Sequence, residues 1–67
     1  MILIDSNWNQ SQRAIERTYL ANTQADVSVP KDDSAVGSTI IVIATGDVWM
    51  KNENGQWQKV GTEEVLA

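Results

Sequence analysis

The pattern of apolar and polar positions changes at about residue 37 and is most regular in the second half of the chain. Residues 38–44 form a continuous, largely β-branched run, which is typical of a strand that is apolar on both faces. Turn-forming residues divide the sequence that follows into two further short strands. The pattern predicts a three-stranded antiparallel meander with strands at 38–44, 48–51 and 56–60, joined by Thr45-Gly46-Asp47 and by Asn54-Gly55.

The first half of the chain carries a weaker pattern, which favours a short helix. Residues 2–4 are strand-like, and residues 5–9 are rich in turn and helix-cap residues. Residues 9–22 contain good helix formers with no Gly or Pro, and a narrow apolar stripe around Ala14 and Ile15. A helix of this length is marginal alone, so we expect it to pack on the meander.

The expected fold class is therefore small α+β, with one short helix packed on a three-stranded antiparallel β-meander and residues 2–4 as an optional N-terminal edge strand. A length of 67 residues fits a single domain. Its expected parts are a strand, cap and helix at 1–22, a connector at 23–37, the meander at 38–61 and a tail at 62–67.

The number of residues in each hairpin loop predicts which side chains share a sheet face. Even-numbered loops at Gly46 and at Asn54-Gly55 pair odd with even positions, and directly paired residues lie on the same face. One face then holds the predicted core, formed by Ile41, Ile43, Val48, Met50 and Trp57. The other face holds the predicted oligomer or partner interface, formed by Ile40, Val42, Trp49 and Val60. The sequence leaves the reverse assignment open, since both faces are apolar and one helix covers only one.

Composition leaves few other means of stabilising such a small chain. There is no Cys and no His, which excludes disulfides and the usual nitrogen and sulfur ligands of a structural zinc site. A single core of this size rarely supplies more than about 3 to 5 kcal/mol. We therefore expect a homo-oligomer in the form of a ring with cyclic symmetry.

The same composition argues against an enzyme. Without His or Cys the usual pairs of nucleophile and base are absent, and the four glycines are widely spaced turn residues rather than a phosphate cradle. We predict no catalytic residue, no cofactor and no metal site. Asp32-Asp33 fits a solvated loop better than half of a cation site, because no further oxygen ligands follow at the calcium-loop spacing.

Charge and the N-terminal sequence limit the expected partners. A net charge of −4 without a Lys/Arg cluster disfavours binding to nucleic acid. The apolar start, Met1–Ile4, ends at Asp5 and is far shorter than a signal peptide's apolar region or a membrane-spanning helix. We expect a soluble product of the cytoplasm with no membrane partner.

The meander also resembles a pattern in short accessory structural proteins of tailed phages and prophages of Gram-positive bacteria. The matching features are Gly-Ser, a hydrophobic strand, Thr-Gly-Asp, a strand with an aromatic residue, a turn and a late Trp, here at Gly37-Ser38, 39–44, Thr45-Gly46-Asp47, Trp49, Asn54-Gly55 and Trp57. The resemblance implies an oligomeric virion or assembly protein (capsid decoration, head–tail or tail component), made in the host cytoplasm and bound to other virion proteins. The alternative is a small acidic phage protein that modulates a host protein. The scattered acidic residues favour the structural role over a mimic with carboxylates in rows.

Overall fold

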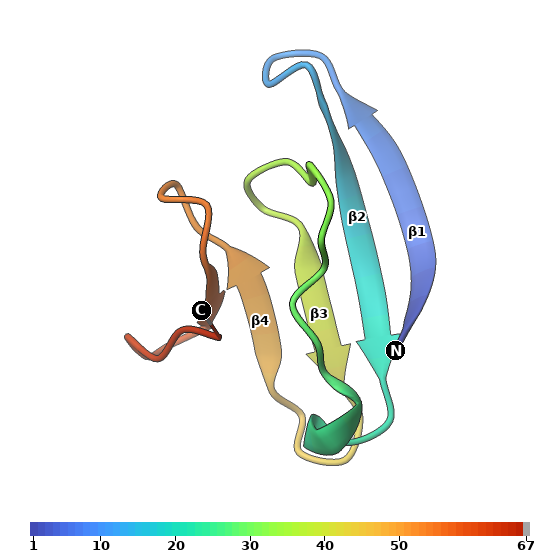
Figure 1. The fold of residues 1–67 in the computed structure, drawn as a ribbon, viewed down its shortest axis with the longest axis vertical. Helices are drawn as coiled ribbons and strands as arrows, with labels where there is room; N and C mark the ends of the chain where they lie inside the picture. The colour runs from blue at the N-terminus through green and yellow to red at the C-terminus, as the bar shows by residue number, and fades with distance from the viewer. Residues whose placement is uncertain (67) are drawn as a thin grey trace.

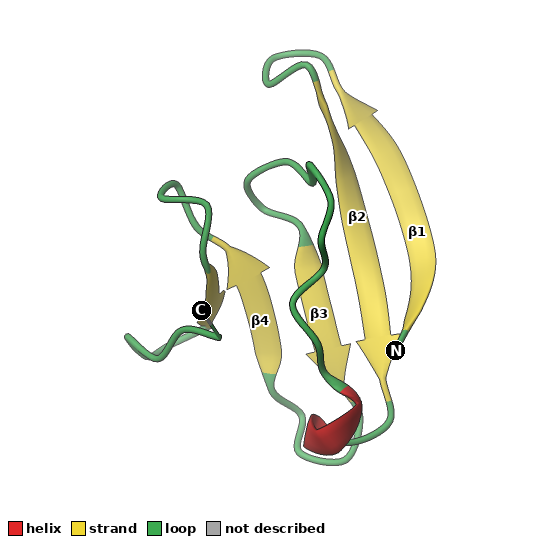
Figure 2. Cartoon of the chain, in the orientation of Figure 1, coloured by secondary structure: helices red, strands yellow, loops and turns green. Residues whose placement is uncertain are grey.

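The computed structural model describes residues 1–66 as a five-stranded sheet with a long connector across one face (Figure 1). The sheet order is β1-β2-β3-β4-β5, and neighbours are antiparallel except for the parallel pair β2 and β3. The only helical element in this part of the chain is a single 3-10 turn, η1 (Figure 2). The elements are β1 (Ile2–Asn9), β2 (Ala14–Ala21), η1 (Gln24–Asp26), β3 (Thr39–Val42), β4 (Val48–Lys51) and β5 (Trp57–Lys59).

The prediction of an α+β fold with a helix at 9–22 is wrong, because this segment forms a turn followed by β2. Residues 10–13 reverse the chain, with Arg13 in the left-handed region at a φ of 52°. The next eight residues include β-branched Ile15 and Thr18 and aromatic Tyr19, which favour an extended strand. Hydrogen bonding to β1 on one side and β3 on the other outweighs the weak helix propensity of the segment. The optional edge strand at residues 2–4 is part of β1, and it pairs with β2 rather than with the meander.

The connector between β2 and β3 covers one face of the sheet, because two parallel strands need a crossover connection. Figure 1 shows it running in front of β3. On this side the partly buried residues Met1, Tyr19, Val27 and Leu66 pack against a core of buried residues. The Tyr19 and Trp57 rings meet edge to face, with centroids 6.4 Å apart. We call this side the covered face and the opposite side the open face. The buried core residues are Ile40, Val42, Trp49 and Trp57.

The two hairpins of the meander differ in loop parity. Ile41 pairs with Val48, so the first loop has an even number of residues, as predicted. In the second hairpin Lys51 pairs with Trp57, which leaves a five-residue loop instead of the predicted two-residue loop. The side chain of Asn52 explains the difference, since its Oδ1 accepts the backbone N–H groups of residues 54 and 56 at 3.0 and 2.9 Å. Ile41 and Trp57 therefore lie on opposite faces, and the predicted sharing of one face is wrong.

The two edges of the sheet are finished differently. At β5 the chain folds back, and Lys59 N donates to Glu64 O while Leu66 N donates to Trp57 O, both at 2.8 Å. Gln58 and Val65 form a further bridge there. At the other edge, no segment within residues 1–66 pairs with the outer side of β1. One edge is thus covered by the chain itself and the other is bare.

Candidate interaction face

An aliphatic row crosses the open face from one edge of the sheet to the other. Ile2 pairs with Leu20, Leu20 with Ile41, and Ile41 with Val48. Val60 continues the row, because its N–H donates to Val48 O at 2.9 Å. Residues in direct register on neighbouring strands project to the same side, so all five side chains lie together on the open face. We call these five residues the aliphatic row.

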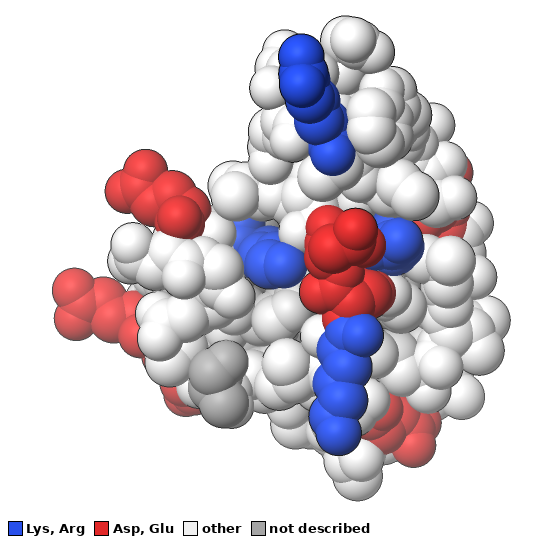
Figure 3. Space-filling model, turned by 45° about the horizontal axis from the view of Figure 1, so that its top comes forward, with Lys and Arg blue, Asp and Glu red and all other residues white. Residues whose placement is uncertain are grey.

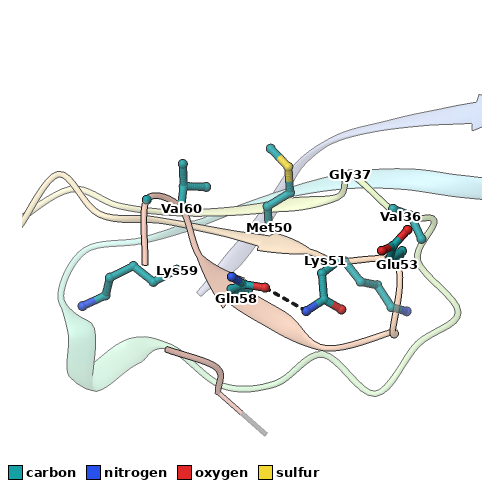
Figure 4. A pocket seen from close by; sticks show the side chains of 10 residues that line it. Val36, Gly37, Met50, Lys51, Glu53, Gln58, Lys59 and Val60 are labelled. Atoms are coloured by element: carbon teal, nitrogen blue, oxygen red, sulfur yellow. Dashed lines mark hydrogen bonds between the residues drawn. The ribbon is translucent and has the colours of Figure 1, made fainter. Parts of the chain in front are cut away.

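A shallow pocket lies beside the row at the β4–β5 end of the open face. It has a volume of about 460 Å³, and its lining includes Val36, Met50, Gln58 and Val60. Figure 4 shows Met50 and Val60 projecting from the same side of the sheet, and the hydrogen bond from Asn52 Nδ2 to Gln58 Oε1, 3.0 Å long. The lining also includes the polar or charged residues Lys51, Asn52, Glu53 and Lys59, so the pocket has a polar rim beside the aliphatic row. An apolar row with such a rim suits contact with another protein surface.

Charged residues lie mainly away from the aliphatic row, although Lys51, Glu53 and Lys59 line the pocket beside it. At the strand positions that point to the open face, only Asp5 and Glu16 are charged, and both lie in the β1–β2 hairpin. Lys59 is on the covered face, with its Nζ 5.2 Å from the centroid of the Trp49 ring. Figure 3, seen from the connector side, shows acidic and basic side chains gathered next to one another there. The centre of the open face is therefore uncharged.

A polar cluster, which we call the clasp, fixes the connector to β2 on the covered face. The Asp32 carboxylate accepts hydrogen bonds from the hydroxyls of Tyr19 and Ser34, and from Ser34 N at 3.0 Å. Arg17 Nη1 lies 3.5 Å from Asp32 Oδ1 and donates to Ser34 Oγ at 3.0 Å. Lys51 Nζ donates to Ser34 O at 2.8 Å, which ties the clasp to β4.

These contacts shift the titration of two groups in the clasp. Burial by itself would raise the pKa of Asp32, but the hydrogen bonds from Ser34 and Tyr19 and the charge of Arg17 hold that pKa below its ordinary value. Burial, together with the hydrogen bond to Asp32, raises the pKa of Tyr19. Ser34 is only 4% exposed, so its hydroxyl is not accessible to a substrate. The geometry therefore gives the clasp a structural role.

For most of the sequence-predicted site residues the roles of the two faces are exchanged, which is the alternative that the sequence left open. Three predicted interface residues, Ile40, Val42 and Trp49, are at most 2% exposed and form the core, while Val60 is 56% exposed at the end of the aliphatic row. The reversal follows from the connector, which covers the face that carries these three side chains. Of the predicted core residues, Trp57 is buried in the core, Ile41 and Val48 are half-buried on the open face, and Ile43 and Met50 are exposed.

Sequence reasoning missed two members of the row, Ile2 and Leu20. Leu20 lies within the segment that the sequence predicts to be a helix, and a helical residue would not pair with residues of neighbouring strands. The β-branched residues Ile15 and Thr18 and the aromatic Tyr19 were the signal that could have favoured a strand.

The described residues give no direct evidence for metal binding or for a membrane-spanning helix. Residues 1–66 contain no group of three or more His, Cys, Asp or Glu side chains placed to hold a metal ion. The same part of the chain has no helix with the length and apolar character needed to cross a membrane.

Comparison of the chain with protein-family models, with curated proteins and with solved structures found no match in any of the three. Functional inference therefore depends on the open face and its chemistry.

Proposed function

We propose that this chain is a non-catalytic assembly subunit that binds a second copy of itself through the open face of its sheet. The observation that carries the proposal is the aliphatic row with its neighbouring pocket, left uncovered on a chain whose connector covers only the other face. Ile2 and Val60, at the two ends of the row, are 62% and 56% exposed. Burying the exposed part of such side chains contributes on the order of 1 kcal/mol each.

Electrostatic repulsion between two copies is weakest at this surface. Each copy carries a net charge of −4, so two copies repel one another over most of their surfaces. The aliphatic row and Met50 are neutral, and the charged residues Lys51, Glu53 and Lys59 lie at the pocket end of the face, so the centres of two opposed open faces bring no like charges together. A two-fold contact needs the same patch on both partners, and a neutral apolar patch meets that condition.

The available area is close to what a stable contact requires. The molecule measures 33 × 25 Å across its broad faces, an outline of roughly 600 Å². Standard stable interfaces bury roughly 800 Å² per partner. The open face alone therefore provides most, but not all, of the area of a standard interface.

We further propose, from the resemblance of residues 37–60, that the assembly is a component of a tailed-phage particle, as a capsid decoration, head–tail or tail protein. Support comes from the residues of the matching pattern, which form turns and contacts between strands. Gly37 has a φ of 95° and Gly46 a φ of 74°, values that favour glycine, and Ser38 Oγ accepts the backbone N–H of Arg17 at 3.0 Å. The pattern thus marks turns and strand contacts, as expected of a structural protein.

Sedimentation velocity at micromolar concentrations tests the open-face contact. Met50→Lys should weaken self-association at least tenfold, because it buries an unpaired charge in the contact. The matched control is Val29→Lys, since Val29 lies in the connector and is 39% exposed, against 41% for Met50. Equal effects of the two variants, or a wild-type chain that remains monomeric, would refute the proposal.

The phage assignment has a separate test, which is mass spectrometry of purified particles from a host strain that encodes the chain. Detection at a stoichiometry comparable to known structural proteins supports the assignment. Absence from the particles overturns it and favours a modulator of a host protein.

A further inference from the structure

The bare edge of β1 is the second uncovered feature of the molecule. It belongs to a strand of eight residues, longer than the usual length of about 5 to 6, whose inner side pairs with β2 and whose outward-facing backbone groups have no strand partner within residues 1–66. Its side chains are also exposed and largely apolar, with Ile2 at 62%, Leu3 and Ile4 at 49% and Trp8 at 60%. Monomeric proteins protect such edges with several charges, proline or a covering segment. Here the protection consists of one charge, Asp5, and a bulge between Leu3 and Asp5.

We propose that β1 pairs antiparallel with β1 of a second copy, so that the edge contact and the open-face contact together build a tetramer. The edge pair joins two sheets into one of ten strands, and two such sheets pack through their open faces. This inference extends the proposed assembly function and rests on it for the face contact. The outward-facing N–H and C=O groups of β1 can form hydrogen bonds with another extended strand. The expected occupant of this edge is therefore a β-strand.

The identity of that strand follows from the two edges of the sheet. The β5 edge is already bonded to residues 64–66 of its own chain, so it is not available to the β1 edge of a neighbour. A second copy therefore offers only its own β1. Like-to-like pairing of this kind is two-fold symmetric and closes, whereas pairing of β1 with β5 would produce an open fibre.

The bulge makes β1 compatible with such two-fold pairing. Leu3 and Ser6 both face the covered side, because their partners on β2 are Tyr19 and Arg17. An antiparallel pair centred between residues 4 and 5 places Leu3 opposite Ser6 of the other copy, so that directly paired side chains share a face. The same register sets Asp5 opposite Ile4, and the two aspartates do not oppose each other.

The symmetry of the edge contact also enlarges the open face. Two antiparallel strands in one sheet are related by an axis perpendicular to that sheet, so both open faces stay on the same side. The face contact then supplies a second two-fold axis, and two perpendicular two-fold axes that intersect give a closed assembly of four chains. The added edge contact makes up for the area that the open face lacks by itself.

Sedimentation velocity of the full chain and three variants tests the inference. One chain has a mass of 7.4 kDa, so the wild type is expected at about 30 kDa. Ile4→Lys places a charge on the bare edge and should leave a face-bonded dimer of about 15 kDa. Met50→Lys should leave an edge-bonded dimer of the same mass, and the Val29→Lys control should remain tetrameric.

Amide hydrogen exchange distinguishes loss of the edge contact from loss of folding. The outward-facing β1 amides should be protected in the wild type and in Met50→Lys, and should exchange freely in Ile4→Lys while the β3 amides stay protected.

A wild-type dimer that Ile4→Lys leaves unchanged and Met50→Lys dissociates would overturn the edge contact and leave the proposed function standing. A dimer dissociated by Ile4→Lys alone would remove the face contact instead. Protection of β1 only when a foreign strand is added would also overturn self-pairing.

Discussion

Replacing Asp32 with Asn perturbs the clasp with almost no change of side-chain volume. Asp32 accepts hydrogen bonds from the hydroxyls of Tyr19 and Ser34 and lies 3.5 Å from Arg17, with 23% of its side chain exposed. The amide keeps one acceptor oxygen and loses the negative charge, and its NH2 group cannot accept the hydrogen bond that a hydroxyl of the clasp donates to the carboxylate. Hydrogen bonds to charged groups contribute about 1.5 to 3 kcal/mol, so we expect Asp32→Asn to cost about 2 kcal/mol.

This loss is large for a chain of 67 residues. Usual stabilities per residue imply about 3 to 10 kcal/mol in total for this length. A loss of about 2 kcal/mol should lower the melting temperature by about 8 to 16 °C in circular dichroism at fixed protein concentration. Asp33→Asn is the matched control, because Asp33 makes only an exposed contact with Arg17 and its side chain is 92% exposed. The control should cost about 0.5 kcal/mol or less. Equal losses in the two variants would show that the clasp does not hold the connector.

The pH dependence provides a second measure of the same contact. The folded-state pKa of Asp32 lies below its unfolded value, so its ionised form contributes stability at all pH values above about 4. That contribution is lost as the pH falls through the folded-state pKa. The wild type should therefore lose more stability than Asp32→Asn between pH 5 and about pH 2. Parallel acid profiles of the two proteins would contradict the assignment.

Three further substitutions test other parts of the fold by urea denaturation. Trp49→Ala should cost about 3 to 5 kcal/mol, because Trp49 fills the core, and a protomer that stays folded would contradict that position. Arg13→Gly should stabilise the chain by about 1 kcal/mol by relieving the left-handed backbone at a φ of 52°, and no gain would argue against this turn. Gly37→Ala should destabilise it by about 1 to 3 kcal/mol through backbone strain alone, since an added Cβ comes no closer than 3.8 Å to Glu16; a neutral effect would argue against the φ of 95°.

The meander was predictable because its signals are local. The β-branched run, the Gly46 turn and the aromatic strand each specify conformation from adjacent residues, and the three predicted strands occur as β3, β4 and β5. The register of the second hairpin was not predictable from the Asn54-Gly55 dipeptide. It depends on the Asn52 side chain, which bonds two backbone N–H groups within the loop and adds to its length. A side chain that competes with a standard turn in this way leaves little trace in a composition pattern.

The first half of the chain was mispredicted because its structure depends on partners distant in sequence. Residues 14–21 contain both helix formers, such as Glu16 and Arg17, and strand formers, such as Ile15 and Tyr19. The choice between them is made by β1 on one edge and by β3, about 20 residues later, on the other. Propensity is a weak guide where long-range pairing decides the conformation.

The strand β2, which forms where the sequence predicts a helix, changes which apolar surface of the molecule is left uncovered. A helix would have covered one sheet face, whereas here the connector covers one face with Val27 and a few polar contacts while β1 extends the sheet beyond the meander. The added strands lengthen the uncovered row by Ile2 and Leu20 and create a bare edge that a three-stranded meander with a docked helix would not have had. Burying such surfaces against another molecule is one means by which a small chain without disulfides gains stability. Under the proposed self-association, the contact is made by Ile41, Val48 and Met50 rather than by Trp49, which is 2% exposed in the core.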